Sequence, residues 1–256
     1  MGAALQARPL NAALSENSMQ KMTAKLLALA FLLQVVSLGT IRQARAQSET
    51  APYPAMAPLN QYLMPDENSE IALARSAAPR SISDGADVMV LGPKGYTIAV
   101  KGTNGFLCIV ERSWGAPTDE PDFWNPKVRA PHCFNPAAAK TFLPIFLMKT
   151  KLVLAGKSKA EILEATASAL DKKELPALEP GAMCYMTSKQ QYLNDRGKSW
   201  HPHLMVFVSG DAAKSWGANL PGSPVLAAND PEERATIFLV VVDNWSDGTP
   251  APQDTH

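Results

Sequence analysis

The sequence lacks the short motifs that identify a catalytic or nucleotide-binding loop. Gly-x-Ser-x-Gly, the Walker A motif and Gly-x-Gly-x-x-Gly are all absent. The 24 Lys and Arg residues equal the 24 Asp and Glu residues in number and are interspersed with them. A nucleic-acid-binding protein needs a basic stripe, so no nucleic-acid partner is expected.

Long apolar runs are equally scarce, and the one that stands out lies near the start. Residues 26–38 are apolar, follow Lys21 and Lys25, and are followed by the small-x-small triplet Ala44-Arg45-Ala46. This order is typical of a secretory signal peptide with its cleavage site. We therefore expect Sec-type export to the periplasm or the extracellular space. An uncleaved N-terminal membrane anchor is the alternative, and no later run reaches membrane-spanning length.

The composition divides the chain into four parts. Residues 1–46 are the predicted signal peptide, and Met19 or Met22 is an alternative start. Residues 47–64 are rich in Pro, Ala and Ser and predict a flexible arm. Residues 65–245 have the length of a single globular domain. The Asp-, Gly- and Pro-rich residues 246–256 predict a disordered tail.

Three short strands are predicted at about 86–112, with glycine-containing turns at 92–95 and 102–105. The second turn contains Asn104-Gly105, a strong hairpin signal, because both residues tolerate positive φ. In the third strand Cys108 and Val110 share one face and Ile109 faces the other, so both faces are apolar. This strand is expected to be covered on both sides and to lie at the core of a three-strand meander.

The rest of the domain alternates helices with strands. Helices are predicted at 65–77, at 137–154 with a kink or break at Pro144, and at 159–172 after a capping box that begins at Ser158. Strands are predicted at 182–187, 203–208 and 235–242, and 115–135 reads as one long loop. The fold class is therefore predicted as α+β, with a mainly antiparallel sheet built on the meander and helices packed on one side.

The chain resembles a group of uncharacterised exported bacterial proteins. The resemblance is carried by Gly102-Thr103-Asn104-Gly105-Phe106-x-Cys108, by a Pro- and Asp-rich loop ending in Cys133, and by the strand His203-Leu204-Met205. No activity is assigned to that group, so the resemblance implies no function. It implies that Cys108 and Cys133 belong to one structural device.

An exported chain meets oxidising conditions, so a Cys108–Cys133 disulfide is the expected form of that device. Two buried thiols that never meet are the alternative. Cys184, in an apolar segment, is expected to be a small core residue rather than a nucleophile.

Two histidines suggest a metal site. In a strand His201 and His203 would point to the same side, and His132 or Asp195 could be a third ligand, so the cofactor alternative is zinc. A structural pair is the other interpretation, with His203 bonded to a backbone carbonyl or a carboxylate. In that case no cofactor is expected.

The tryptophans Trp114, Trp124 and Trp200 flank strands or lie in loops, where aromatic side chains line a ligand groove or cover a core. Two functions follow. The favoured one is a non-catalytic exported domain that binds a small ligand, an envelope component or a partner. The alternative is a metal-assisted hydrolase that uses His201 and His203.

Overall fold

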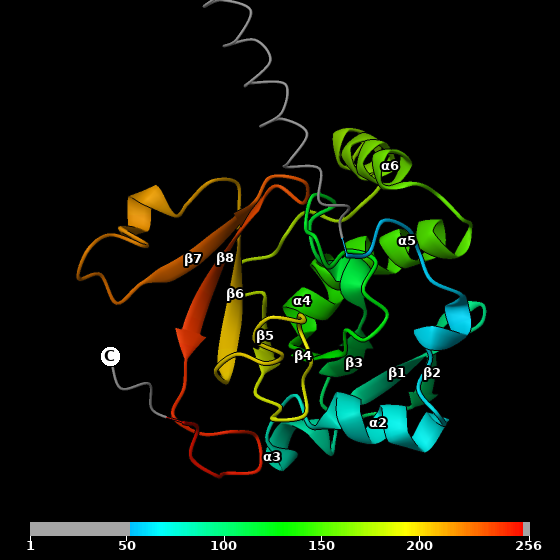
Figure 1. Ribbon diagram of the computed structural model, residues 1–256. Coiled ribbons are helices and arrows are strands. Elements are labelled where there is room, and N and C mark those ends of the chain that lie inside the picture. The colour runs from blue at the N-terminus through cyan, green and yellow to red at the C-terminus, as the bar shows by residue number, and fades with distance from the viewer. Residues whose placement is uncertain (1–51, 253–256) are drawn as a thin grey trace, which may run out of the picture. The chain divides into compact units, whose positions relative to one another are not determined.

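The computed structural model describes residues 52–252 (Figure 1). The predicted signal peptide, the first five residues of the predicted arm and the last four residues of the predicted tail lie outside this range. Within it, no helix is both long and apolar enough to cross a membrane.

A mixed sheet of eight strands organises this part of the chain, in the order β2-β1-β3-β4-β5-β6-β8-β7. Every neighbouring pair is antiparallel except β1 and β3, which run parallel. The prediction of a mainly antiparallel sheet with helices is therefore confirmed. The strands are β1 (Asp87–Gly92), β2 (Gly95–Val100), β3 (Leu107–Glu111), β4 (Ala130–Phe134), β5 (Met183–Met186), β6 (His203–Ser209), β7 (Leu226–Asp230) and β8 (Ala235–Val241).

The three-strand meander is only partly correct. β1 and β2 form the expected hairpin, but β3 pairs with β1 instead of β2. The reason lies in the loop between β2 and β3, which is bonded to the beginning of β1. Gly102 N donates to Asp87 Oδ1 at 2.6 Å, and Thr103 N donates to Gly85 O at 2.7 Å. A Cβ on Gly102 would lie 2.3 Å from Ala86 C, so only glycine allows this crossing.

Two strands arise where none is predicted. β4 lies inside the expected 115–135 loop, where Pro126 and Pro131 obscure the strand pattern, yet it pairs with both β3 and β5. β7 is an edge strand that pairs only with β8. The sheet is therefore larger than expected and continuous from β2 to β7.

The helices begin and end close to their predicted bounds. α2 (Glu67–Arg75) is capped by Asp66, and α6 (Lys159–Asp171) has the predicted capping box between Ser158 and Glu161. The predicted 137–154 helix is split at Phe142 into α4 (Pro136–Thr141) and α5 (Leu143–Leu154), because Pro144 favours a new first turn. The shorter elements are α3 (Arg80–Ser83), η1 (Leu59–Gln61), η2 (Ser113–Gly115) and η3 (Lys214–Trp216).

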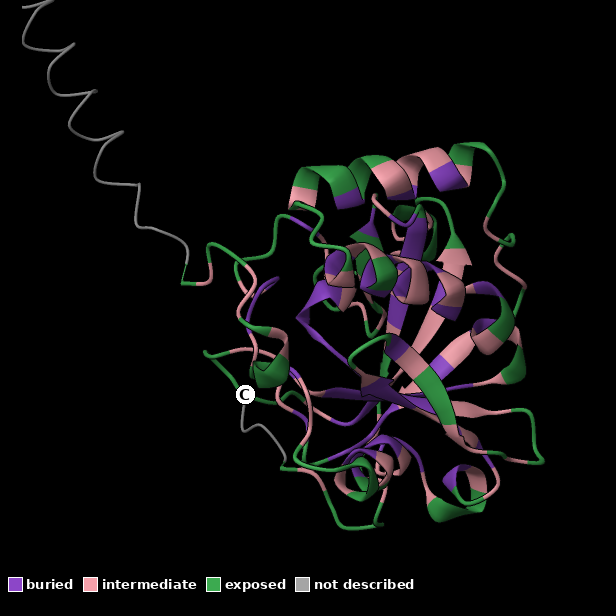
Figure 2. Ribbon diagram, turned by 90° about the vertical axis from the view of Figure 1, so that its right-hand side faces the viewer, coloured by how far each residue is buried: buried purple, intermediate pink, exposed green. Residues whose placement is uncertain are grey.

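Helices cover both faces of the sheet, which corrects the prediction of one covered side. α2 packs Leu73 and Ala74 on the face that carries Cys108 and Val110. α4, α5 and α6 pack on the opposite face, where Ile109 lies. Figure 1 shows α2 and α5 on opposite sides of the strands, and Figure 2 shows that strands in the middle of the fold are coloured as buried. β3 and β4 are buried at nearly every position. The cause is the two-sided apolar pattern of β3, which needs cover on each face.

Cys108 and Cys133 lie directly opposite each other on β3 and β4 and form a disulfide on the α2 face. Their Cα atoms are 4.0 Å apart. The expected bridge is thus present, and it joins two neighbouring strands. Cys184 is a buried free thiol, as predicted.

Both ends of the described range lie against the domain. Tyr62, in the predicted flexible arm, is fully buried, and its hydroxyl donates to Trp124 O at 2.8 Å. In the predicted tail, Asp247 forms an ion pair with Lys189 at 2.6 Å. Residues on both sides of 65–245 therefore make contacts with the domain.

Candidate functional site

The register of β3 and β4 brings Glu111 and His132 together on one face of the sheet. Glu111 ends β3 and lies opposite Ala130, the first residue of β4. His132 is two residues further along β4, so it points to the same side as Ala130 and lies diagonal to Glu111. Glu111 Oε2 is 3.9 Å from His132 Nδ1.

The hydrogen bonds of His132 define its protonation. Nδ1 lies 2.9 Å from Ala130 O, and a carbonyl oxygen only accepts, so Nδ1 carries the proton. Burial lowers the pKa of His132 to about 4, and the bond to the Ala130 carbonyl acts in the opposite direction. At neutral pH the ring is therefore uncharged, and Nε2 is a hydrogen-bond acceptor. No group in the described residues donates a hydrogen bond to Nε2.

Glu111 is a buried carboxyl group without a hydrogen bond from any described residue, and only 8% of the residue is exposed. Burial raises the pKa of Glu111 to about 8, while the nearby positive charge of Lys149 lowers it. At neutral pH most molecules therefore hold Glu111 in its protonated form. A carboxylic acid and a neutral imidazole thus lie side by side with unused hydrogen-bonding capacity.

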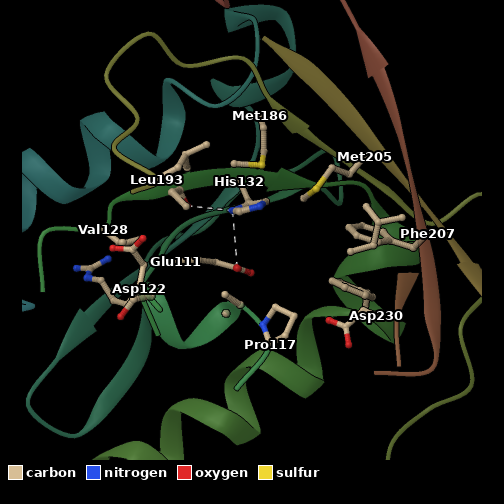
Figure 3. A pocket seen from close by; sticks show the side chains of 17 residues that line it. Glu111, Pro117, Asp122, Val128, His132, Met186, Leu193, Met205, Phe207 and Asp230 are labelled. Carbon is tan, nitrogen blue, oxygen red and sulfur yellow. Dashed lines mark hydrogen bonds and ion pairs between the residues drawn. The ribbon is translucent and has the colours of Figure 1, made fainter. Parts of the chain in front are cut away.

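Both side chains face a cavity of about 270 Å³, here called the Glu111 cavity. Figure 3 shows Glu111 and His132 pointing towards each other near its middle, with Met186 and Met205 on one side and Pro117 on the other. The wall is mainly apolar, and its larger side chains are Phe142, Met186, Leu193, Met205, Phe207 and Ile237. The cavity lies between the sheet, the start of α5 and the loop after η2.

Gly115 makes room for the Glu111 carboxyl group. A Cβ at Gly115 would lie 2.6 Å from Glu111 Oε2 and 3.5 Å from the Phe146 ring. The backbone of Gly115 does not have a positive φ, so glycine is favoured here by the close approach of the carboxyl group alone. Ser113, in the same turn, lines the cavity, and its buried Oγ has no hydrogen-bond partner among the described residues.

Further carboxyl groups surround a buried lysine next to the cavity. Lys149 Nζ donates to Ala116 O at 3.0 Å and to Glu233 Oε1 at 3.3 Å. Burial raises the pKa of Glu233 to about 7, and it also raises the pKa of Asp230, which lines the cavity. Lys149, which is buried, therefore already has a carboxyl partner of its own.

A network centred on Asp195 holds the loops at one edge of the cavity. Its carboxylate accepts hydrogen bonds from the Tyr192 and Tyr53 hydroxyls and from Lys127 Nζ at 3.0 and 3.1 Å. These bonds, the one from Tyr192 foremost, keep the pKa of Asp195 well below its usual value. Leu193 and Val128, which line the cavity, lie within two residues of these groups. The Asp195 network thus fixes the two loops that contribute them.

The three histidines of the predicted metal site are not arranged around one point. His203 is 3% exposed, and its Nδ1 lies 2.7 Å from the backbone carbonyl of His201, which is the geometry of the structural interpretation. His132 lies two strands away on the same face, with Met186 on the strand between them. Across residues 52–252 there is no group of three or more His, Cys, Asp or Glu side chains placed to hold a metal ion.

The three tryptophans of the predicted ligand groove do not lie together, because two are in the core and one is at the surface. Trp114 is fully buried, its Nε1 donates to Thr150 Oγ1 at 2.9 Å, and Trp124 is 5% exposed. Both belong to the main hydrophobic core, so neither edges a groove. Trp200 is 37% exposed and lines a separate hollow with His201 and Trp245.

The sequence contained one usable signal for this site. Glu111 continues the alternation of Leu107 and Ile109, so the strand pattern places a carboxyl group on a core-facing position. His132 gave no such signal, because its strand was hidden within the proline-rich segment. Sequence reasoning named His132 only as a metal ligand and did not single out Glu111.

Comparison of the chain with models of protein families, with curated proteins and with solved structures finds no match.

Proposed function

We propose that this protein binds a small ligand with an apolar body and one polar group in the Glu111 cavity. The observation that carries the proposal is the pair of unsatisfied polar groups, the Glu111 carboxyl and His132 Nε2, inside an apolar wall. A ligand that supplies partners to these groups would use hydrogen-bonding capacity that no described residue uses.

The size of the cavity limits the ligand. An apolar cavity of about 150 Å³ holds a benzene-sized molecule. A cavity of about 270 Å³ therefore suits roughly ten non-hydrogen atoms. Small-molecule sites are typically of this kind, with an apolar wall and a few placed polar groups.

We also propose that binding takes place outside the cytoplasm. The Cys108–Cys133 disulfide supports this location, because such bridges persist in oxidising compartments. The signal-peptide pattern of residues 1–46 points the same way.

The proposal can be tested by isothermal titration calorimetry with 1-hexanol, a probe with an apolar body and one hydroxyl group. We expect saturable binding of one molecule per chain. Ala130→Leu should abolish it, because Ala130 lines the cavity and lies on the same side of the sheet as His132. Ala228→Leu makes the same change on the exposed edge strand β7 and should leave binding intact. Absence of saturable binding, or equal binding by both variants, would refute the proposal.

A further inference from the structure

Carboxyl groups outnumber cations among the residues that line the cavity. Three carboxyl side chains, those of Glu111, Asp122 and Asp230, line it. Arg112 is the only Lys or Arg among the lining residues. Its guanidinium group is engaged elsewhere, by Glu70 Oε1 at 2.9 Å and by the Tyr62 carbonyl at 2.7 Å. An anionic ligand would therefore meet carboxyl groups and no available cation.

His132 adds a second, independent requirement. Its ring is buried, and the Ala130 carbonyl fixes the proton on Nδ1, so Nε2 can only accept a hydrogen bond. A partner for Nε2 must bring an N–H or an O–H group. A carboxylate, an ether or a ketone cannot supply one, whereas an amine or an alcohol can.

Glu111 distinguishes between these two donors. An alcohol can pair with the protonated carboxyl group, but it leaves the negative surroundings uncompensated. An ammonium group has up to three N–H donors, enough for His132 Nε2 and for an ionised Glu111 together. A hydrogen bond between two charged groups is about twice as strong as one between neutral groups.

From the lining charge and the acceptor at His132, we infer that the ligand of the Glu111 cavity is a small amine, an ammonium group on an apolar body. The inference rests on the proposed function, because it assigns a chemical class to the ligand of that same cavity. The ammonium nitrogen lies between Glu111 and His132 Nε2, and the apolar body lies against Met186, Met205 and Phe207.

Amine binding is linked to release of one proton from Glu111. The carboxyl group is protonated in most empty molecules at neutral pH and becomes ionised when the ammonium group arrives. Affinity should therefore rise with pH until Glu111 is ionised in the empty protein, and then level off. The other titratable groups around Glu111 are His132 on β4, Cys184 on β5, Lys149 on α5, Tyr96 on β2, and Asp230 and Glu233 near the β7–β8 turn.

The test compares three probes of equal length, hexylammonium, 1-hexanol and hexanoate, by titration calorimetry at pH 7 and pH 9. We expect hexylammonium to bind most tightly and hexanoate least. The pKa of about 8 for Glu111 implies that hexylammonium affinity rises about tenfold between the two pH values, while hexanol affinity stays constant. At pH 7, titrations in two buffers of different ionisation enthalpy should show proton release.

Glu111→Gln separates charge from shape, because the amide has nearly the same volume. This variant should lose about tenfold or more in hexylammonium affinity at pH 9 and keep its hexanol affinity. Asp230→Asn is a second variant that changes a lining carboxyl group without altering the Glu111–His132 pair. It should retain the pH dependence.

The two proposals fail in different ways. If no probe binds, including hexanol, the proposed function is wrong. If hexanol binds as tightly as hexylammonium in the wild type, or if Glu111→Gln binds hexylammonium unchanged, the cavity binds ligands but the amine class is overturned.

Discussion

Replacing Gly115 by alanine probes the centre of the site without replacing any of its existing side chains. The added Cβ would lie 2.6 Å from Glu111 Oε2, nearer than such atoms can approach, so the carboxyl group must move into the cavity. The contact with Phe146 at 3.5 Å is ordinary van der Waals packing and requires no movement.

The magnitude follows from two opposing effects. Alanine at a position that does not need positive φ stabilises a protein by about 0.4–1 kcal/mol, because it reduces the freedom of the unfolded chain. Overpacking costs typically about 1–3 kcal/mol, and the lower end applies here because the displaced atom ends a flexible side chain. We therefore expect Gly115→Ala to lower the free energy of unfolding by at most about 0.6 kcal/mol in the wild type.

A double-mutant cycle isolates the contact. In a Glu111→Ala background the carboxyl group is gone, and Gly115→Ala should stabilise the protein by about 0.5 kcal/mol. In a Glu111→Gln background the amide keeps its place, so the substitution should remain destabilising. Urea unfolding followed by circular dichroism measures all six proteins. Equal effects of Gly115→Ala in the wild type and in Glu111→Ala would refute the placement of the carboxyl group over Gly115.

Three further predictions concern stability. The free energy of unfolding of the wild type, relative to Glu111→Gln, should fall as pH rises from about 4.5 to about 8, by up to about 1.4 kcal/mol per pH unit. The sign follows because the folded state holds a proton on Glu111 that the unfolded state has already lost. Urea titrations at several pH values measure the difference in the free energy of unfolding between the two proteins. A difference that does not change with pH would contradict the prediction. Replacing both Cys108 and Cys133 by alanine should cost about 3 kcal/mol in chemical denaturation, since the bridge closes a separation of 25 residues; a loss below about 1 kcal/mol would contradict this. Glu70→Ala leaves the guanidinium group of Arg112 buried without its carboxylate at 2.9 Å, which should cost about 3–5 kcal/mol, whereas Glu67→Ala on the same helix should cost far less.

Local signals in the sequence predicted the helices well. The capping box at Ser158 and the proline at position 144 each act within one turn, so neither depends on distant parts of the chain. The apolar pattern of residues 107–110 likewise predicted a strand covered on both faces, although we expected helices on only one of them.

The sequence did not allow us to predict which strands distant in the chain pair with each other. The choice of β3 to pair with β1 depends on the bonds that Gly102 and Thr103 make to residues 85–87, which no propensity encodes. β4 was missed because Pro131 argues against a central strand, although its missing N–H is tolerated opposite Val110. Because His132 lies on β4, the failure to predict this strand also prevented us from predicting that His132 lies beside Glu111.

The disulfide determines which side chains the cavity contains, although it lies on the opposite face of the sheet. Side chains along a strand alternate between faces, so sliding β4 by one residue against β3 would exchange its two sets of side chains. His132 would then point towards α2, and Cys133 would enter the cavity beside Glu111. A covalent link between Cys108 and Cys133, which are direct partners across the two strands, forbids that slip. The bridge thus fixes the register of β3 and β4, and with it the side chains on the opposite face of the sheet. Oxidation of the two thiols selects the register in which Glu111 and His132 are neighbours.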